Sequence, residues 1–210
     1  MRLLLCIVVL LFSSGLLAQN MGVRVGLTTA TPTGNNDTFD FDFLESFSPG
    51  YQAGVFGNFK LSDVIILKPE LSYREYTIKQ EVTWYVNNYN IDQKHTTFSG
   101  DLNFDIELTN YLSLIFGIGM DYITAIQITT SINQFNEVSK LDLSDMSMDQ
   151  RMDPFSNVGL CFKFGRSVLV DLQYRHLLEN WETGNLTSAF SSDNGSVKLH
   201  MINVTLGVLF

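Results

Sequence analysis

The sequence predicts an all-β protein, an eight-stranded antiparallel up-and-down transmembrane β-barrel of the outer-membrane type, and three observations carry this prediction. Eight segments alternate apolar and polar residues at a period of two, the signature of a strand whose two faces meet different solvents. Short turns and long polar connections follow each other in alternation, as they do between the strands of outer-membrane barrels. The last segment ends at an aromatic residue, Phe210, which we interpret as a signal for barrel assembly.

Residues 1–18 have the pattern of a cleaved signal peptide. Arg2 gives a positive start, residues 3–12 are apolar, and Ala18 precedes the expected cut. The apolar run is shorter than the roughly 20 residues of a membrane-spanning helix. We therefore expect export from the cytoplasm and a mature outer-membrane barrel domain of residues 19–210, in which Cys161 is the single cysteine and no internal disulfide forms.

The composition narrows the classes of partner. Its 13 Lys and Arg stand against 22 Asp and Glu, a net charge of −9. This acidity argues against nucleic acid, because phosphate binding needs clustered Lys and Arg. Beyond the expected cut no apolar run approaches the length of a membrane-spanning helix, which excludes a helical membrane protein. The 16 Phe and 8 Tyr suit strands flanked by aromatic girdles.

The first four strands are expected at residues 21–30, 50–60, 64–83 and 94–108. The first has an apolar face of Val23, Val25 and Leu27. The second sets alternate residues from Tyr51 to Phe59 against a face that ends at Lys60. In the third, an apolar face that includes Pro69 opposes Lys68, Glu70, Ser72 and Arg74, and a β-bulge is expected at the proline because it lacks a ladder donor. The fourth is the clearest, with a polar face of Ser99, Asp101, Asn103, Asp105 and Glu107.

The last four strands are expected at residues 111–126, 154–164, 167–176 and 197–210. In the fifth, apolar residues from Leu112 to Tyr122 oppose Gly117, Gly119 and Asp121. The sixth and seventh have apolar faces opposite Asn157, Gly159, Cys161 and Lys163, and opposite Asp171, Gln173 and Arg175. The eighth places Ile202, Val204, Leu206, Val208 and Phe210 on one face.

The connections predict which end of the barrel faces the periplasm. Tight turns are expected at residues 61–63, 109–110 and 165–166, and long polar connections at residues 31–49, 84–93, 127–153 and 177–196. Outer-membrane barrels have short periplasmic turns and longer outer loops, so both termini are expected in the periplasm. A soluble barrel is an alternative, because its polar outer face would also carry charges.

The stretch from Gly50 to Asp63, followed by residues 67–74, carries a family resemblance. A Gly-rich strand, a Leu-Ser-Asp turn and a Pro-Glu-Leu-Ser-Tyr strand follow one another there, and this pattern resembles the PorT-like family of outer-membrane β-barrel proteins of Bacteroidetes. The resemblance implies a barrel and an accessory role in an envelope assembly such as a secretion or gliding system. The expected partners are therefore outer-membrane lipid, the barrel assembly machinery and other envelope or secretion proteins, around a monomeric barrel.

Charged residues on the predicted inward faces are expected to form a structural ion-pair network, because eight strands leave an interior that side chains just fill. Its expected members are Lys60, Lys68, Glu70, Arg74, Asp101, Asp105, Glu107, Asp121, Lys163, Asp171 and Arg175. A cation path or a catalytic carboxylate pair is the alternative reading of the acidic row in the fourth strand.

No catalytic, cofactor or metal site is expected. His95, His176 and His200 fall in three separate segments near the outer rim, where we expect them to be exposed, and Cys161 is expected to pack in the lumen. Nucleophile-elbow, phosphate-loop and dinucleotide motifs are missing from the sequence. An enzyme is therefore the least favoured function, after a passive channel, a ligand-binding barrel and a soluble periplasmic barrel.

Two groups of aromatic residues are candidates for contact with a partner or glycan. Trp84, Tyr85 and Trp181 lie near expected strand ends, where an interfacial girdle is the alternative explanation. Phe39, Phe41 and Phe43 alternate with aspartates in a long connection and would extend the barrel or offer an edge to a partner.

Overall fold

The computed structural model describes residues 20–34, 48–84, 87–132, 135–141, 143, 151–178 and 197–210. These residues form nine strands: β1 (Asn20–Gly34), β2 (Pro49–Lys60), β3 (Ile65–Trp84), β4 (Asn87–Thr109), β5 (Leu112–Ile132), β6 (Phe135–Lys140), β7 (Met152–Phe164), β8 (Val168–Leu177) and β9 (Val197–Leu209). The expected signal peptide and the candidate contact residues Phe39, Phe41, Phe43, Tyr85 and Trp181 lie outside the described residues.

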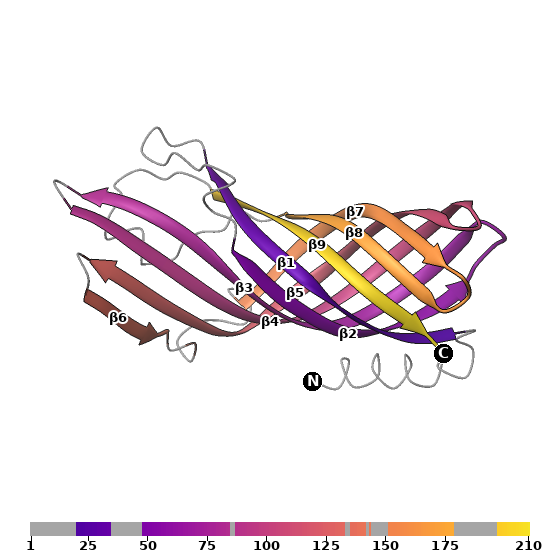
Figure 1. The fold of residues 1–210 in the computed structure, drawn as a ribbon, viewed down its shortest axis with the longest axis horizontal. Coiled ribbons are helices and arrows are strands. Elements are labelled where there is room, and N and C mark those ends of the chain that lie inside the picture. Colours follow the sequence, from indigo (N-terminus) through magenta and orange to yellow (C-terminus); the bar gives the residue numbers. More distant parts are fainter. Residues whose placement is uncertain are drawn as a thin grey trace.

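Eight of these strands close into an antiparallel barrel, which confirms the predicted fold (Figure 1). The spatial order is β4-β3-β2-β1-β9-β8-β7-β5, and β4 also pairs with β5 along their length, so the sheet has no edge at membrane level. The ladder between the first and last strands runs from Gly22 opposite Leu209 to Gly34 opposite Val197. It is extended by Phe210, whose backbone N–H donates to the carbonyl of Met21 at 2.8 Å.

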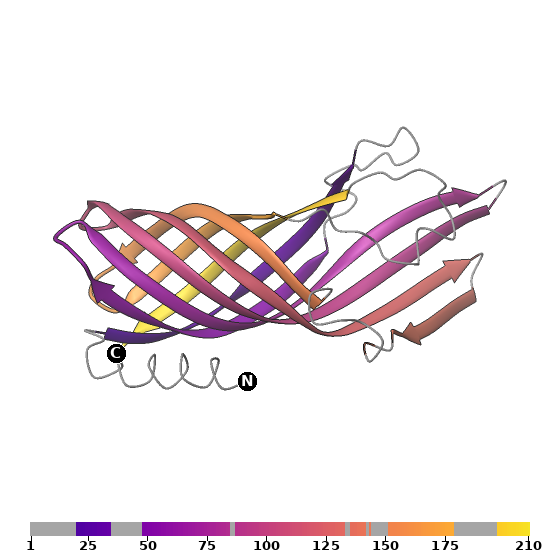
Figure 2. The same ribbon diagram turned by 180° about the vertical axis from the view of Figure 1, so that it is seen from behind.

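The tight turns lie together at one end of the barrel, and the C-terminus lies at the same end (Figures 1 and 2). In the turn after β2, the Ser62 hydroxyl accepts the backbone N–H of Ile65 at 3.1 Å. In the turn after β7, Gly165 has a φ of 67°, which glycine adopts without steric cost. This end matches the periplasmic end of an outer-membrane barrel.

The outer surface of the barrel is an apolar belt. On β4, exposed apolar side chains from Phe98 to Leu108 alternate with buried polar ones. Ten residues rise about 34 Å along a strand, and a tilt of about 40° reduces this to about 26 Å, close to the apolar band of outer-membrane barrels. The apolar face points outward, the reverse of a soluble barrel, whose apolar face points inward. Among the described residues, no helix is long and apolar enough to cross a membrane.

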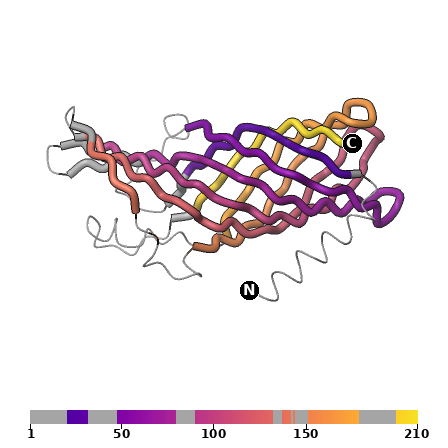
Figure 3. Tube along the Cα trace, turned by 90° about the horizontal axis from the view of Figure 1, so that it is seen from below, coloured from indigo at the N-terminus to yellow at the C-terminus, as the bar shows by residue number. Residues whose placement is uncertain are grey.

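Three strands continue beyond the belt, on the side away from the turns (Figures 1 and 3). We call residues 76–84, 87–96, 124–132 and 135–140 the outer extension. β3 and β4 stay paired from Tyr76 opposite His95 to Trp84 opposite Asn87, and β6 pairs with the outer part of β5. Figure 1 shows these two hairpins projecting past the ends of the other barrel strands.

The outer extension corrects two predicted connections. Most of residues 84–93 were expected in a loop but belong to the β3–β4 hairpin, and β6 lies within the expected loop of residues 127–153. The reason is physical. Outside the membrane the two faces of a strand no longer meet different solvents, so apolar and polar residues need not alternate there.

The expected bulge at Pro69 is also wrong. Pro69 pairs with Leu102 of β4 in an unbroken register, and the register with β2 is the same before and after it. The β2–β3 pairing is instead interrupted between the pairs Phe56–Glu70 and Phe59–Leu67. Pro69, which has no backbone N–H to donate, lies within this unpaired stretch. The β4–β5 pairing has two register shifts. One lies on β5 next to Thr124, where the outer extension leaves the barrel, and the other lies between Glu107 and Thr109 at the turn.

Candidate functional site

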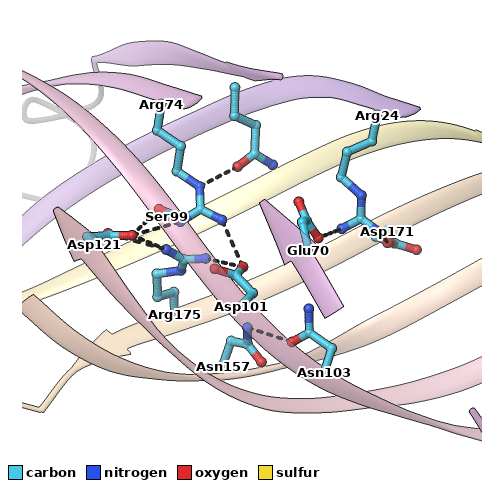
Figure 4. Close-up of polar contacts among 11 residues, drawn as sticks. Arg24, Glu70, Arg74, Ser99, Asp101, Asn103, Asp121, Asn157, Asp171 and Arg175 are labelled. Carbon is cyan, nitrogen blue, oxygen red and sulfur yellow. Dashed lines mark hydrogen bonds and ion pairs between the residues drawn. The ribbon is translucent and has the colours of Figure 1, made fainter. Parts of the chain in front are cut away.

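The candidate functional site is the barrel lumen, where buried charged side chains from opposite walls meet (Figure 4). Strand alternation puts them there, because the neighbours of each charged residue on its strand face outward into the apolar belt. On β4, for example, Asp101, Asn103 and Asp105 are buried while Leu102 and Phe104 are exposed. The charged residues form two clusters at different heights.

The upper cluster consists of Arg74, Asp101, Asp121 and Arg175. The Arg74 guanidinium donates to Asp101 at 2.9 Å and to Asp121 at 3.1 Å. The Arg175 guanidinium donates to the same two carboxylates, at 2.7 Å to Asp101 and 3.0 Å to Asp121. Two guanidinium groups thus balance two carboxylates. Two further contacts hold Arg74, to the Gln52 amide oxygen at 2.8 Å and the Ser99 hydroxyl at 2.6 Å.

The lower cluster consists of Arg24, Lys68, Glu70, Asp105 and Asp171. Arg24 bridges Glu70 at 2.7 Å and Asp171 at 2.9 Å. The Lys68 ammonium pairs with Asp105 and lies 3.9 Å from Asp171. All five side chains are at most 2% exposed. A buried charge without a counter-charge costs several kcal/mol. Loss of one member of this cluster would therefore leave its partners as uncompensated buried charges.

Aromatic rings and amides fill the space around the two clusters. The Phe155 ring lies 3.4 Å from the Arg175 guanidinium carbon, and the Phe56 ring lies 4.6 Å from that of Arg24. Between the clusters, the Asn157 amide donates to the Asn103 side-chain oxygen at 2.9 Å. Buried apolar residues lie at both ends of the lumen, including Tyr76 and Met201 towards the outer side and Cys161 and Leu169 towards the turns. Cys161 is therefore packed in the lumen.

The structure brings eight of the predicted network residues into the two clusters: Lys68, Glu70, Arg74, Asp101, Asp105, Asp121, Asp171 and Arg175. Glu107 and Lys163 form a separate, half-buried pair nearer the turns. Lys60 was wrongly placed in the network. It is the last residue of β2, its side chain is 46% exposed, and it pairs with Asp63 in the turn at 3.5 Å. Strand alternation places Lys60 on the inward-facing side of β2. Because the residue lies at the turn end of that strand, its side chain reaches solvent and not the lumen.

Arg24 is the network residue that sequence reasoning missed. It contacts both Glu70 and Asp171 and is buried. Its signal was present in the sequence, because Arg24 stands between Val23 and Val25 of an alternating strand and must therefore face inward. Buried polar residues such as Asn203 and Gln173 follow the same rule.

The three histidines are less exposed than the sequence predicted. His95 was expected to be exposed but is fully buried, stacked on Tyr76 with ring centroids 5.3 Å apart. It lies beyond the apolar belt, and burial lowers its pKa from 6.5 to about 4. His176 and His200 are half-buried on the outward face and lie opposite each other on β8 and β9. The barrel thus brings together two of three histidines that the sequence separates.

An aromatic girdle lies at the outer end of the belt. Tyr51, Tyr73 and Phe98 form a row of ring contacts on β2, β3 and β4, with centroids 6.1 Å and 5.6 Å apart. Tyr122 on β5 continues this row, because it lies opposite Phe98 in the register. Trp84, a candidate contact residue, is the last residue of β3 and lies far above this row.

The ion pairs of the lumen favour a structural role for its charged residues over a catalytic one. Each carboxylate of the two clusters is within ion-pair distance of an arginine or lysine, and the cations come from strands on different walls. The acidic row of β4 is consequently divided among four cations: Asp101 pairs with Arg74 and Arg175, Asp105 with Lys68 and Glu107 with Lys163. Such pairs link the walls of the barrel to one another across the lumen.

The solved structures of similar fold include outer-membrane barrels. The chain is similar to Ail, the attachment invasion locus protein of Yersinia pestis, with 12% identity, a TM-score of 0.50, and coverage of 91% of this chain and 98% of Ail. It is also similar to Neisserial surface protein A, with 9% identity, a TM-score of 0.47, and coverage of 90% and 97%. A third is the N-terminal β-barrel domain of Pseudomonas aeruginosa OprF, with 13% identity, a TM-score of 0.44, and coverage of 91% and 98%. At these identities the likeness shows the fold alone.

No curated protein matches the chain. The sequence profile of one family does match, over residues 4–210, and its description is outer membrane protein beta-barrel domain. That match agrees with the closed barrel, the outward apolar belt and the polar lumen described above. The chain belongs to the outer membrane protein beta-barrel domain family.

Proposed function

We propose that the protein is a non-conducting, non-enzymatic anchor in the outer membrane and acts there as an accessory component of an envelope assembly. The observation that carries this proposal is the lumen network, because its arginines reach from opposite walls to shared carboxylates. A barrel closed in this way has only its outer surfaces for function. The PorT-like resemblance of residues 50–74 favours a secretion or gliding assembly of Bacteroidetes.

A passive channel and a ligand-binding barrel receive less support. A channel needs a water-filled path, yet Arg74 and Arg175 meet across the lumen between two apolar layers. A barrel for a hydrophobic ligand needs an apolar, unfilled interior, yet this one holds buried charges at two heights. An enzyme needs a carboxylate or nucleophile free to react with substrate, and the lumen carboxylates are held by cations.

The outer extension is the proposed contact surface for the partner. It projects past the membrane-level barrel and is not needed to close it, because β4 and β5 already pair at the level of the belt (Figure 3). Its β3–β4 hairpin rises for many residues above the aromatic girdle. In this proposal the apolar contacts to the partner come from Phe39, Phe41, Phe43, Trp84, Tyr85 and Trp181.

The test is the native mass and composition of the tagged protein drawn from isolated outer membranes in mild detergent. The tag is placed near residue 185, because Phe210 is kept free for barrel assembly. A stoichiometric companion is expected. Recovery at monomer mass without one overturns the assembly role, and absence from the membrane fraction contradicts outer-membrane anchoring.

A second variant locates the contact. Residues 81–90 are replaced by Asn-Gly, a two-residue turn that joins Gln80 to its register partner Ile91. Ile91 is kept because it packs against the buried cluster of Ile123, Ile126 and Ile128. The shortened protein should insert but lose the companion, whereas Lys60→Ala, at the opposite end, should keep it. Retention of the companion by the shortened protein contradicts the proposed surface.

A further inference from the structure

Three polar side chains converge on the outward surface where β8 and β9 leave the apolar belt. Tyr174 and His176 are two residues apart on β8 and so share a face, and His200 lies opposite His176 on β9. Leu172, the preceding outward residue of β8, is exposed in the belt. Tyr174 and the two histidines therefore stand at the outer edge of the membrane, within reach of ions in the external medium.

The polar atoms of this group lie within hydrogen-bonding distance of a single nitrogen. The Nδ1 atoms of His176 and His200 are 3.3 Å apart, and the Tyr174 hydroxyl is hydrogen-bonded to the same Nδ1 of His200. The two imidazole rings are stacked with centroids 4.8 Å apart, and the Tyr174 ring lies 5.7 Å from that of His200.

Both of these contacts involve the same nitrogen, Nδ1 of His200. An imidazole nitrogen has one position in the ring plane, occupied either by a proton or by a lone pair. His200 Nδ1 therefore cannot make good hydrogen bonds to Tyr174 and to His176 at once. A cation between the three atoms would instead be bound by all three lone pairs, because phenol oxygen and neutral imidazole nitrogen are both electron-pair donors.

We propose that Tyr174, His176 and His200 bind a divalent transition-metal ion on the outer side of the membrane. Two nitrogens at about 2.05 Å from a tetrahedral ion are about 3.3 Å apart, which is the separation found here. Because the rings are stacked, one imidazole must turn about its Cβ–Cγ bond so that both lone pairs converge on the ion. Water or a further side chain completes the coordination.

The donor set selects the class of ion. Imidazole favours zinc, copper and nickel over the hard cations calcium and magnesium, which prefer oxygen ligands. Among the described residues no group of three or more His, Cys, Asp and Glu could hold a metal, so the phenol of Tyr174 is what makes this a three-donor site. A bound ion would join β8 to β9 near their outer ends. The inference is independent of the proposed function.

Copper is the probe, since it binds such donors most tightly among the common divalent ions. The mature chain, refolded in detergent micelles, is titrated with Cu²⁺ by calorimetry and examined by electron paramagnetic resonance. One ion per chain is expected, with hyperfine coupling to two imidazole nitrogens. His176→Gln and His200→Gln should each weaken the Kd by at least about tenfold, the minimum expected for loss of a direct ligand. Tyr174→Phe should weaken binding yet keep both nitrogen couplings.

His95→Gln is the matched control. The His95 side chain is fully buried on the inward face of β4, so this substitution should leave the copper titration unchanged. Folding of each variant is checked by the mobility of unheated samples in detergent gels. If a Gln variant does not fold, carbethoxylation of the wild type replaces it, with Zn²⁺ expected to protect His176 and His200. Three results would each overturn the proposal. The wild type binds no stoichiometric copper, or a protein with both His176→Gln and His200→Gln binds copper as the wild type does. The third is carbethoxylation of the two histidines at equal rates with and without Zn²⁺.

Discussion

Arg74 and Arg175 extend from opposite walls of the barrel and donate to the same oxygen, Oδ2 of Asp101, at 2.9 and 2.7 Å. Arg74 lies on β3 and Arg175 on β8, which are four strands apart in either direction around the barrel. Asp121 accepts from both guanidinium groups as well (Figure 4). This shared pair of carboxylates connects walls that no backbone ladder joins directly, and the stability of the barrel should depend on it.

Arg74→Ala should lower the midpoint of thermal unfolding of the refolded barrel in detergent. The substitution leaves two buried carboxylates with one guanidinium, and an unbalanced buried charge costs on the order of 3 kcal/mol. Lys60→Ala is the control, since its ion pair with Asp63 is exposed and such pairs contribute about 0–1 kcal/mol. An equal midpoint for the two variants would count against a buried network.

Gly22→Ala should also destabilise the barrel, by about 1–3 kcal/mol, the usual cost of overpacking. A Cβ on Gly22 would lie 2.4 Å from Cζ of Phe56, the ring that covers Arg24 in the lower cluster. Gly100→Ala is the matched change on the outward face, where the nearest atom is Leu71 Cδ2 at 3.8 Å. Denaturant unfolding of both variants checks this, and a Gly22→Ala protein as stable as Gly100→Ala would refute tight packing at Phe56.

His95 should make the barrel less stable in acid. Its pKa is lowered from 6.5 to about 4 by burial, so between these values the unfolded chain binds a proton that the folded chain does not. Stability is therefore lost as the pH falls from 6.5 towards 4, by at most about 1.4 kcal/mol per pH unit. His95→Phe, which keeps a ring against Tyr76, should remove this part of the pH dependence. Identical pH profiles of unfolding for variant and wild type would show that His95 does not titrate in this way.

Phe210→Ser should separate assembly from stability. Phe210 is 75% exposed, while its backbone pairs with Met21 and closes the β1–β9 seam. Substitution of the side chain should leave the unfolding midpoint in detergent nearly unchanged and reduce the amount inserted in cells. Equal insertion of variant and wild type in isolated outer membranes would remove Phe210 as an assembly signal.

The fold was predictable because the membrane forces each strand residue to face lipid or lumen. Asp101 and Asp105 could be placed in the lumen from alternation with Leu102 and Phe104 alone, and the structure buries both. The same rule would have found Arg24, between Val23 and Val25, had it been applied to the first strand. It misplaced Lys60 because parity gives the face of a strand and not the height along it.

Beyond the belt the rule loses its physical basis. The outer part of the β3–β4 hairpin and β6 lie in water, where both faces of a strand can be polar. Their sequences therefore lack the alternation of a strand and were predicted to be loops. The contact between His176 and His200 depends on the register of β8 with β9, which a single sequence does not specify. Pairings inside the lumen, such as Arg74 with Asp121, similarly depend on the tilt and stagger of eight strands together.

The most direct test of the closed lumen is the conductance of the purified protein in a planar lipid bilayer. With Arg74 and Arg175 joined through Asp101 and Asp121, the wild type should show no current above that of the bare bilayer. Insertion is verified beforehand by protease protection of the same protein in liposomes. Steady, discrete current steps from the inserted wild type would contradict a lumen closed by its ion pairs.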